Sequence, residues 1–399
     1  MIKNALIATL GTISLIAGNF TTASNQVSEE EMTEISQTKM RLENFLQVAI
    51  ERDHFSGVVM VVHRGKVLLN QGYGMASIDD KNEQDTFMHV ASITKQFTAA
   101  AIMKLWEAGV IDLNASINTY LSEEYQSDTW KKVTVHHLLS HTGGVVDYDE
   151  SYYNAETKSF CFNDAIKAMI SESQGKGLNF EPGTEWRYSN IGYTLLGVIL
   201  ENTTGLSYGD VIKEYIFDKA GMASSTIHDE NYVAKSGHAT GHRWDKEQRK
   251  LVEDNEKCLP VTPSDGGLVT TSEDLYEWSD VLAGKRPDVL SPEILKRMTT
   301  PVPISFKPDG YGYGLFIDDS SGTRRIHHPG LISGFRSHFS FYPEKELYIS
   351  VFCNNSTTNP LQITEGLSEI MGEKGQRFQL SFFLDEVKIR FLKLLANFY

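Results

Sequence analysis

The chain has 399 residues, of which 41% are hydrophobic, 22% charged and 11% aromatic, a composition typical of globular proteins. This length is sufficient for one large domain or two ordinary ones with a substantial core. A formal net charge of −15 argues against nucleic acid or an anionic membrane surface as the main partner.

The first 24 residues have the pattern of an export signal. Lys3 supplies a positive charge, and the apolar run from Ala5 to Ala17 is too short to anchor the chain across a bilayer. Small residues near Ala23 provide a cleavage point. A buried N-terminal helix is the alternative. We expect residues 1–24 to be a signal peptide and the protein to be exported, either periplasmic or secreted.

The next segments predict a helix followed by a hairpin. Residues 29–53 repeat apolar side chains at helical spacing, and residues 57–74 contain two β-branched runs about a tight Arg64-Gly65 turn. Residues 92–285 are mostly helical segments joined by loops rich in Gly, Asp and Ser. Strand patterns return in "TRRIHH", "GFRSHFSFY" and "ELYISVFC".

An early hairpin and a late set of strands predict one antiparallel sheet built from both ends of the chain. The fold class is therefore α/β in the α+β sense. We expect a domain at 25–370, with its sheet part at about 55–90 and 310–370. The helices of about 92–285 form a lobe beside the sheet.

Two features give no decision on function. Residues 371–399 have the pattern of an amphipathic helix, which either docks on the protein's own surface or contacts a membrane or a partner. Three cysteines, Cys161, Cys258 and Cys353, allow at most one disulfide and form no CxxC metal motif.

The stretch "HVASITKQF" places Ser92 three residues before Lys95 at a predicted helix start. Residues i and i+3 of a helix share one face, so the lysine amine is expected beside the serine hydroxyl. A serine becomes a nucleophile when a neighbouring group takes its proton, and the positive end of the helix favours the charge that develops. S-x-x-K is a weak motif alone, because Ser36–Lys39 and Ser173–Lys176 also match it.

A second candidate segment, "WRYSNIGY", contains Tyr188 and Asn190 before an apolar helical run. A tyrosine whose pKa is lowered by a lysine is able to act as a general base, and an amide is able to orient the lysine and the substrate. The structural alternative is a packed tyrosine and an asparagine that caps the helix. A second Y-x-N, starting at Tyr152, shows that this motif is also weak alone.

A third candidate segment is "RRIHHPGLISGF". A strand that ends at His328-Pro329-Gly330 is expected to border the site, and the backbone N–H of Leu331 is expected to act with that of Ser92 as an oxyanion donor. His141 in "LLSHTGG" competes for the role of His328. It follows a helix in a loop and lacks the edge strand, so His328 is preferred.

Together, five segments resemble the serine β-lactamase and penicillin-binding protein superfamily, in its class C, D,D-carboxypeptidase and esterase-like branch. They are "VASITKQF", "LLSHTGG", "FEPGTEWRYSNIGYTLLGVI", "GGLVTTSEDL" and "HHPGLISGF", within about residues 55–355. The resemblance implies a β-lactamase/transpeptidase-like fold, with an antiparallel sheet flanked by helices, a helical lobe and the site between them.

The resemblance also implies roles for individual residues. Ser92 is the acylated nucleophile, Lys95 and Tyr188 are its proton-transfer partners, and Asn190 positions the substrate. His328, with Gly330 and Leu331 after it, stands where the family has the first residue of K-T-G or H-x-G. Pro329 replaces a hydroxyl residue that often contacts a substrate carboxylate, and proline has neither hydroxyl nor N–H. This departure favours esters, amides or small peptides.

Other motifs have ordinary structural explanations. "GLSYG" matches a nucleophile elbow, but the run before it predicts a helix instead of the strand that an elbow requires. The pairs His137/His141 and His238/His242 lack the H-E-x-x-H pattern of zinc enzymes. We therefore expect no metal and no cofactor.

The sequence predicts a serine hydrolase that acts on a small molecule or peptide through an acyl-enzyme. A β-lactam, a D-amino-acid peptide or a carboxylic ester is the substrate. The alternative is a catalytically silent binding protein of the same fold that senses cell-wall fragments.

Overall fold

The computed structural model describes residues 29–148, 163–230, 232–234, 236–245, 247–254, 262–303, 310–319 and 322–372. The expected signal peptide, the C-terminal segment from residue 373, Cys161 and Cys258 lie outside these residues. Cys353 is buried with a free thiol. Among the described residues, no helix is long and apolar enough to cross a membrane.

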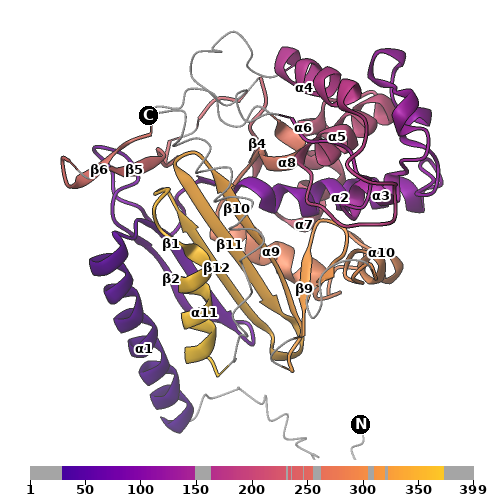
Figure 1. Ribbon diagram of the computed structural model, residues 1–399. Coiled ribbons are helices and arrows are strands. Elements are labelled where there is room, and N and C mark those ends of the chain that lie inside the picture. Colours follow the sequence, from indigo (N-terminus) through magenta and orange to yellow (C-terminus); the bar gives the residue numbers. More distant parts are fainter. Residues whose placement is uncertain are drawn as a thin grey trace, which may run out of the picture.

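The main sheet is antiparallel and has seven strands in the order β2-β1-β12-β11-β10-β9-β8 (Figure 1). The strands are β1 (Gly57–His63), β2 (Lys66–Tyr73), β8 (Gly310–Tyr311), β9 (Phe316–Asp318), β10 (Arg325–Ile332), β11 (Phe335–Tyr342) and β12 (Leu347–Cys353). The last strand pairs with the first hairpin, from Gly57 opposite Cys353 to His63 opposite Leu347. The sheet is thus built from both ends of the chain, and the predicted fold class is confirmed.

Strand β10 continues past the point where the sequence analysis ended it. The predicted end was His328-Pro329-Gly330, but the strand runs two residues further, to Ile332, and pairs Pro329 with His338 of β11. On its other side β10 pairs with β9 only from Arg325 to His327. Pro329 lies beyond this ladder, so its missing N–H removes no hydrogen bond from that side.

Two layers of helices flank the sheet. One face is covered by α1 (Glu29–Asp53) and α11 (Pro360–Ile370), and Figure 1 shows both helices lying against it. Leu42 and Leu46 of α1 and Leu367 of α11 are fully buried against alternate β-branched residues of β1. This alternation explains why the hairpin contains continuous apolar runs, since the opposite face is also covered.

The other face carries the helical lobe. It contains α2 (Lys95–Glu107), α3 (Val135–Leu139), α4 (Asn163–Lys176), α5 (Asn190–Thr204), α6 (Tyr208–Ile212), α7 (Asp218–Ala220), α8 (Pro263–Gly266), α9 (Ser272–Leu282) and α10 (Pro292–Met298). Two small sheets join it, one of β3 (Met88–His89), β7 (Leu268–Thr270) and β4 (Thr226–Ile227), the other of β5 (His242–Asp245) and β6 (Lys250–Glu253). Helix α2 is buried on all sides through most of its length, so it forms the centre of the lobe.

The serine of "GLSYG" caps a helix. Ser207 precedes α6, and its hydroxyl accepts a hydrogen bond of 3.2 Å from the Asp210 amide. Gly205 ends α5 in the left-handed conformation, at φ 74°. The structural interpretation of this motif is therefore confirmed.

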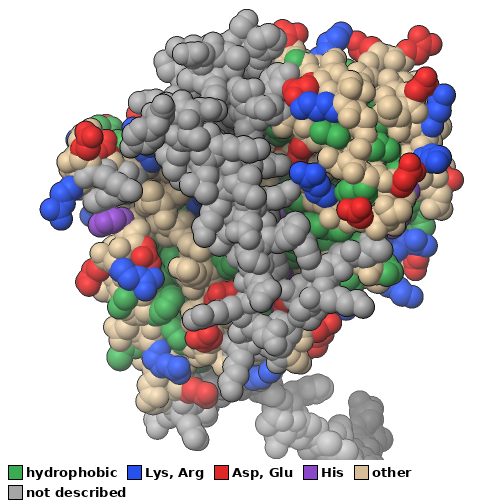
Figure 2. All heavy atoms as spheres, viewed as in Figure 1, with side chains coloured by type: hydrophobic (Ala, Val, Ile, Leu, Met, Phe, Trp, Pro, Cys, Tyr) green, Lys and Arg blue, Asp and Glu red, His purple; other side chains and the backbone are tan. Residues whose placement is uncertain are grey.

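Oppositely charged side chains are interspersed on the surface of the lobe, as Figure 2 shows. Exposed pairs such as Lys167–Glu124, at 2.6 Å, and Arg297–Glu293, at 2.9 Å, are examples. Such pairs contribute little to stability, because water screens both partners.

Three histidines from separate segments pack together beside the small sheet. The ring of His89 lies 5.0 Å from the rings of both His228 and His238. Burial lowers the pKa of His228 and of His238 to about 4, and it lowers the pKa of His89 well below 6.5. Among the described residues, no group of three or more His, Cys, Asp or Glu is arranged to hold a metal ion.

We expect this histidine cluster to make the fold sensitive to acid. Each histidine stays neutral in the folded protein but takes a proton near pH 6.5 when unfolded, so stability present above pH 6.5 is lost as the pH falls toward 4. The slope is about 1.4 kcal/mol per pH unit for each such histidine. Urea unfolding of wild type and His238→Gln from pH 7.5 to 4.5 measures it. Equal slopes for the two proteins would contradict the assignment.

Candidate active site

Ser92 lies in a tightly held 3-10 turn, Ala91–Thr94, directly before α2. Val90 is fixed from two sides, because its N–H donates to Leu268 O at 3.1 Å and its carbonyl accepts from Ser337 Oγ at 2.8 Å. Ala91 has a left-handed backbone, at φ 49°, which is unfavourable for a residue with a Cβ. The surrounding contacts hold the serine segment in this strained conformation.

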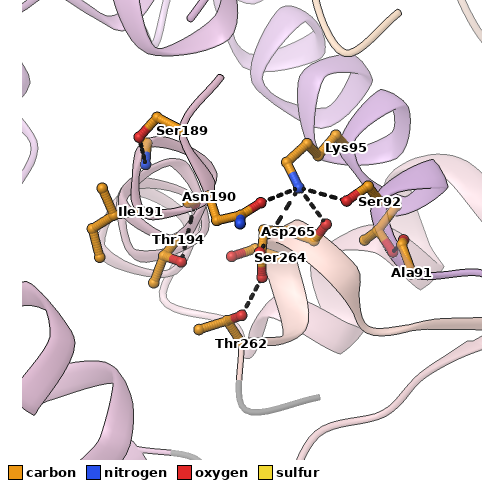
Figure 3. Close-up of polar contacts among 12 residues, drawn as sticks. Ala91, Ser92, Lys95, Ser189, Asn190, Ile191, Thr194, Thr262, Ser264 and Asp265 are labelled. Carbon is orange, nitrogen blue, oxygen red and sulfur yellow. Dashed lines mark hydrogen bonds and ion pairs between the residues drawn. The ribbon is translucent and has the colours of Figure 1, made fainter. Parts of the chain in front are cut away.

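The Lys95 amine is the centre of the site. Its Nζ lies 3.1 Å from Ser92 Oγ, 3.0 Å from Asn190 Oδ1 and 2.8 Å from the backbone carbonyl of Asp265. Figure 3 shows these three groups converging on the amine from separate elements. The side chain is fully buried, and the Asp265 carboxylate lies 3.8 Å from Nζ.

Burial brings the pKa of the Lys95 amine close to neutral pH. Desolvation lowers the pKa of the amine to about 8, while Asp265 and Asp147 oppose this change. The amine is still mainly protonated at pH 7, and the neutral form that the reaction needs has two N–H groups and one lone pair. With the N–H groups donated to Asn190 Oδ1 and Asp265 O, the lone pair remains for the Ser92 hydroxyl. The geometry therefore suits proton abstraction from Ser92.

Tyr188 lies against this group, but its pKa differs from the expectation. The Lys95 amine lies 5.0 Å from the centre of the Tyr188 ring. Burial raises the pKa of the phenol well above 10, although a hydrogen bond with Ser92 opposes the rise. The lowered pKa expected from the sequence is therefore wrong, because desolvation of the phenol outweighs its hydrogen bond with Ser92. The phenol stays protonated and is suited to pass a proton on.

Asn190 is the first residue of α5, but it does not cap the helix. Ser189 does so, because its hydroxyl accepts from the Gly192 amide at 3.2 Å. Asp147 accepts from the amides of Asn190 and Ile191, both at 2.9 Å. These contacts fix the helix start and leave the Asn190 side chain directed at Lys95.

His328 lies at the border of the site, fully buried on β10. Burial and the Lys95 charge lower the pKa of its ring well below 6.5, so it is neutral. Its Nδ1 lies 2.6 Å from Pro329 O and therefore carries the proton, which leaves Nε2 to accept from the Tyr311 hydroxyl at 3.3 Å. Both ring nitrogens are thus occupied, and His328 lines the site without access to a transferable proton.

Gly330 permits β10 to touch the serine segment. A Cβ at this position would lie 2.1 Å from Val90 O and 2.2 Å from Ser337 Oγ. Leu331, the next residue, is 39% exposed beside this contact. Its amide and that of Ser92 remain predicted oxyanion donors.

Sequence reasoning missed three neighbours of this site. Asp265 lies beside Lys95, although the two residues are 170 positions apart. The Tyr311 hydroxyl forms a hydrogen bond with His328 Nε2. His141 was weighed as a competitor of His328 and as part of a zinc pair with His137, and in the structure its buried ring lies 4.3 Å from that of Tyr188. Spacing rules relate residues of one element and give no signal for such long-range neighbours.

The fold and these side chains together define the class of protein. A model of the Beta-lactamase family matches residues 40–367, so the chain belongs to that family. It is thereby a member of a serine hydrolase superfamily.

Individual relatives agree with this assignment. Penicillin-binding protein 4* of Bacillus subtilis is 27% identical over 301 residues, which are 72% of this chain and 65% of that protein. The chain thus spans about two thirds of that relative's length. The octameric penicillin-binding protein homologue of Pyrococcus abyssi superimposes with a TM-score of 0.73 at 28% identity, over 84% of this chain and 78% of that one.

A third relative shows the fold alone. The D-amino acid amidase of Ochrobactrum anthropi SV3 superimposes with a TM-score of 0.72 at 20% identity, over 84% of this chain and 99% of that one.

Proposed function

We propose that the protein is a hydrolase that cleaves an amide or ester bond through an acyl-enzyme on Ser92. One observation carries the proposal: a buried Lys95 amine, with a pKa lowered to about 8, lies 3.1 Å from Ser92 Oγ. The alternative, a catalytically silent binding protein of the same fold, requires no such pairing.

In the proposed reaction the Ser92 proton moves to Lys95 Nζ as Oγ bonds to the substrate carbonyl carbon. Collapse of the tetrahedral adduct breaks the bond to the leaving group, which receives a proton through the Tyr188 hydroxyl and, ultimately, from the Lys95 ammonium. Water then attacks the acyl carbon, gives one proton to Lys95, and releases the acid as Ser92 regains its hydrogen. The amides of Ser92 and Leu331 stabilise the oxyanion at each step.

The residues of β10 and β11 favour a substrate without a free carboxylate at this edge. Pro329 offers no hydroxyl and no N–H. Ser337 pairs with Gly330, but its buried hydroxyl donates to Val90 O at 2.8 Å. We therefore propose neutral esters and amides, including amides of D-amino acids, ahead of penicillins.

The test is a substrate panel with wild type and Ser92→Ala. We expect hydrolysis of an activated short-chain ester and of a D-amino-acid amide, slower hydrolysis of a penicillin, and background rates for the variant. A folded wild type that is silent toward all three would favour the binding alternative. Retained turnover in Ser92→Ala would reject the nucleophile.

We also propose that this activity is exercised outside the cytoplasm, because residues 1–24 have the pattern of an export signal. Sequencing the N-terminus of the protein recovered from its producing cells tests this. An intact Met1 would contradict export by cleavage.

A further inference from the structure

The Lys95 site contains a carboxylate that the motif does not include. Asp265 belongs to the short helix α8 and is only 5% exposed. Its backbone carbonyl accepts from Lys95 Nζ at 2.8 Å, and its carboxylate lies 3.8 Å from the same atom. One residue therefore contacts the amine both through a hydrogen bond and through charge (Figure 3).

We propose that Asp265 is a positioning residue that holds Lys95 beside Ser92 and sets the pH at which the amine takes the serine proton. The inference rests on the proposed function for its catalytic meaning. Asp265 acts through Lys95 and has no direct contact with the reacting atoms.

The Asp265 carboxylate is itself held in place. The Thr262 hydroxyl donates a short hydrogen bond to Oδ1, and this leaves Oδ2 toward Lys95. Burial raises the pKa of Asp265 to about 6, which still leaves it ionised at neutral pH. An ionised carboxylate at this distance stabilises the ammonium that forms when Ser92 loses its proton.

Besides Asp265, one other carboxylate and burial change the pKa of Lys95, in opposite directions. Asp147 raises its pKa as Asp265 does, whereas burial lowers it. The remaining ionisable neighbours have shifted pKa values that keep them neutral: Tyr188 and Tyr193 beside the amine, and His141 and His328, whose pKa values the Lys95 charge lowers. Tyr208 lies on the Asp265 side and is likewise neutral. Asp265 is the carboxylate of this group that lies within 4.0 Å of the amine among the described residues.

The variant Asp265→Asn isolates the charge. Asparagine has the same shape, and its side-chain oxygen still accepts from Thr262, so the fold is retained. Loss of the charge lowers the pKa of Lys95 from about 8, by about one pH unit or more. Asp265→Ser is a second neutral variant, and Asp265→Glu restores the charge. Asp274→Asn is the matched control, since Asp274 is 7% exposed at the start of α9 and accepts from Ser225 Oγ.

The pKa of Lys95 is measured directly by NMR titration of protein labelled with ¹³Cε-lysine. The Lys95 signal is assigned by its absence in Lys95→Met. We expect a lower midpoint in Asp265→Asn and Asp265→Ser, and a return toward wild type in Asp265→Glu. Equal midpoints in wild type and Asp265→Asn would overturn the inference, and so would an equal shift in Asp274→Asn.

The pH–rate profile gives the catalytic readout on the substrate that wild type hydrolyses best. For Asp265→Asn we expect the acid limb of kcat/KM to move down with the NMR midpoint. We also expect kcat at the plateau to fall about tenfold, with KM unchanged. A raised KM with an unmoved limb would overturn the inference. If wild type hydrolyses nothing, the proposed function fails alone, because the NMR titration still decides the role of Asp265.

Discussion

Replacement of Lys95 by methionine is expected to reduce turnover on the order of 10⁴-fold, as loss of a proton-transfer partner does in other serine hydrolases. The substitution removes the amine that lies 3.1 Å from Ser92 Oγ, and methionine has no group that accepts the serine proton. It also leaves the Asp265 carboxylate buried without its cation, so we expect the melting temperature to fall as well.

Lys104→Met is the matched control for Lys95→Met. Lys104 lies in the last turn of the same helix, away from Ser92, and is partly exposed. Its substitution is expected to leave kcat within about twofold of wild type, since it changes only surface charge. Initial rates and thermal unfolding of both variants make the comparison. Activity within tenfold of wild type in Lys95→Met would contradict the assigned role.

Substitution of Gly330 by alanine is expected to reduce activity by about 100-fold, because even a displacement of about 1 Å misplaces reacting groups. The new methyl group would lie 2.1 Å from the Val90 carbonyl, two residues before the nucleophile. The backbone of β10 and the serine segment must then separate, at a cost of about 1–3 kcal/mol in stability.

Gly175→Ala provides the control for Gly330→Ala. Gly175 lies exposed in α4, and a Cβ there meets no atom within 4 Å. Alanine is favourable in a helix, so this variant is expected to be as stable as wild type or slightly more so. Wild-type rates and stability in Gly330→Ala would contradict the prediction that close packing of β10 against the Ser92 segment requires glycine at this position.

Sequence periodicity predicted those parts of the site that depend on one element. Ser92 and Lys95 are three residues apart, so the i, i+3 rule was sufficient to place the amine near the hydroxyl. The distance of 3.1 Å agrees with that expectation. Asn190 also lies where its position before an apolar helix suggested, although Ser189 makes the cap.

Electrostatic properties were harder to predict, because they depend on burial from every side. The Tyr188 pKa rises instead of falling, since its phenol is enclosed by residues of several elements. The contact of Asp265 with Lys95 was not predicted for the same reason, because it depends on the packing of α8 against α5 and against the Ser92 turn. No local pattern in "TPSDGG" indicates a contact with a residue 170 positions away.

The most direct test of the account is the identification of the acylated residue. Purified protein is exposed briefly to an activated short-chain ester and, separately, to a penicillin, and is then analysed by intact-mass spectrometry and peptide mapping, with Ser92→Ala as the control. We predict an acyl adduct on the peptide that contains Ser92, absent from the variant, with the ester adduct hydrolysing during the time course. An adduct on another residue, or equal labelling of Ser92→Ala, would contradict the central claim.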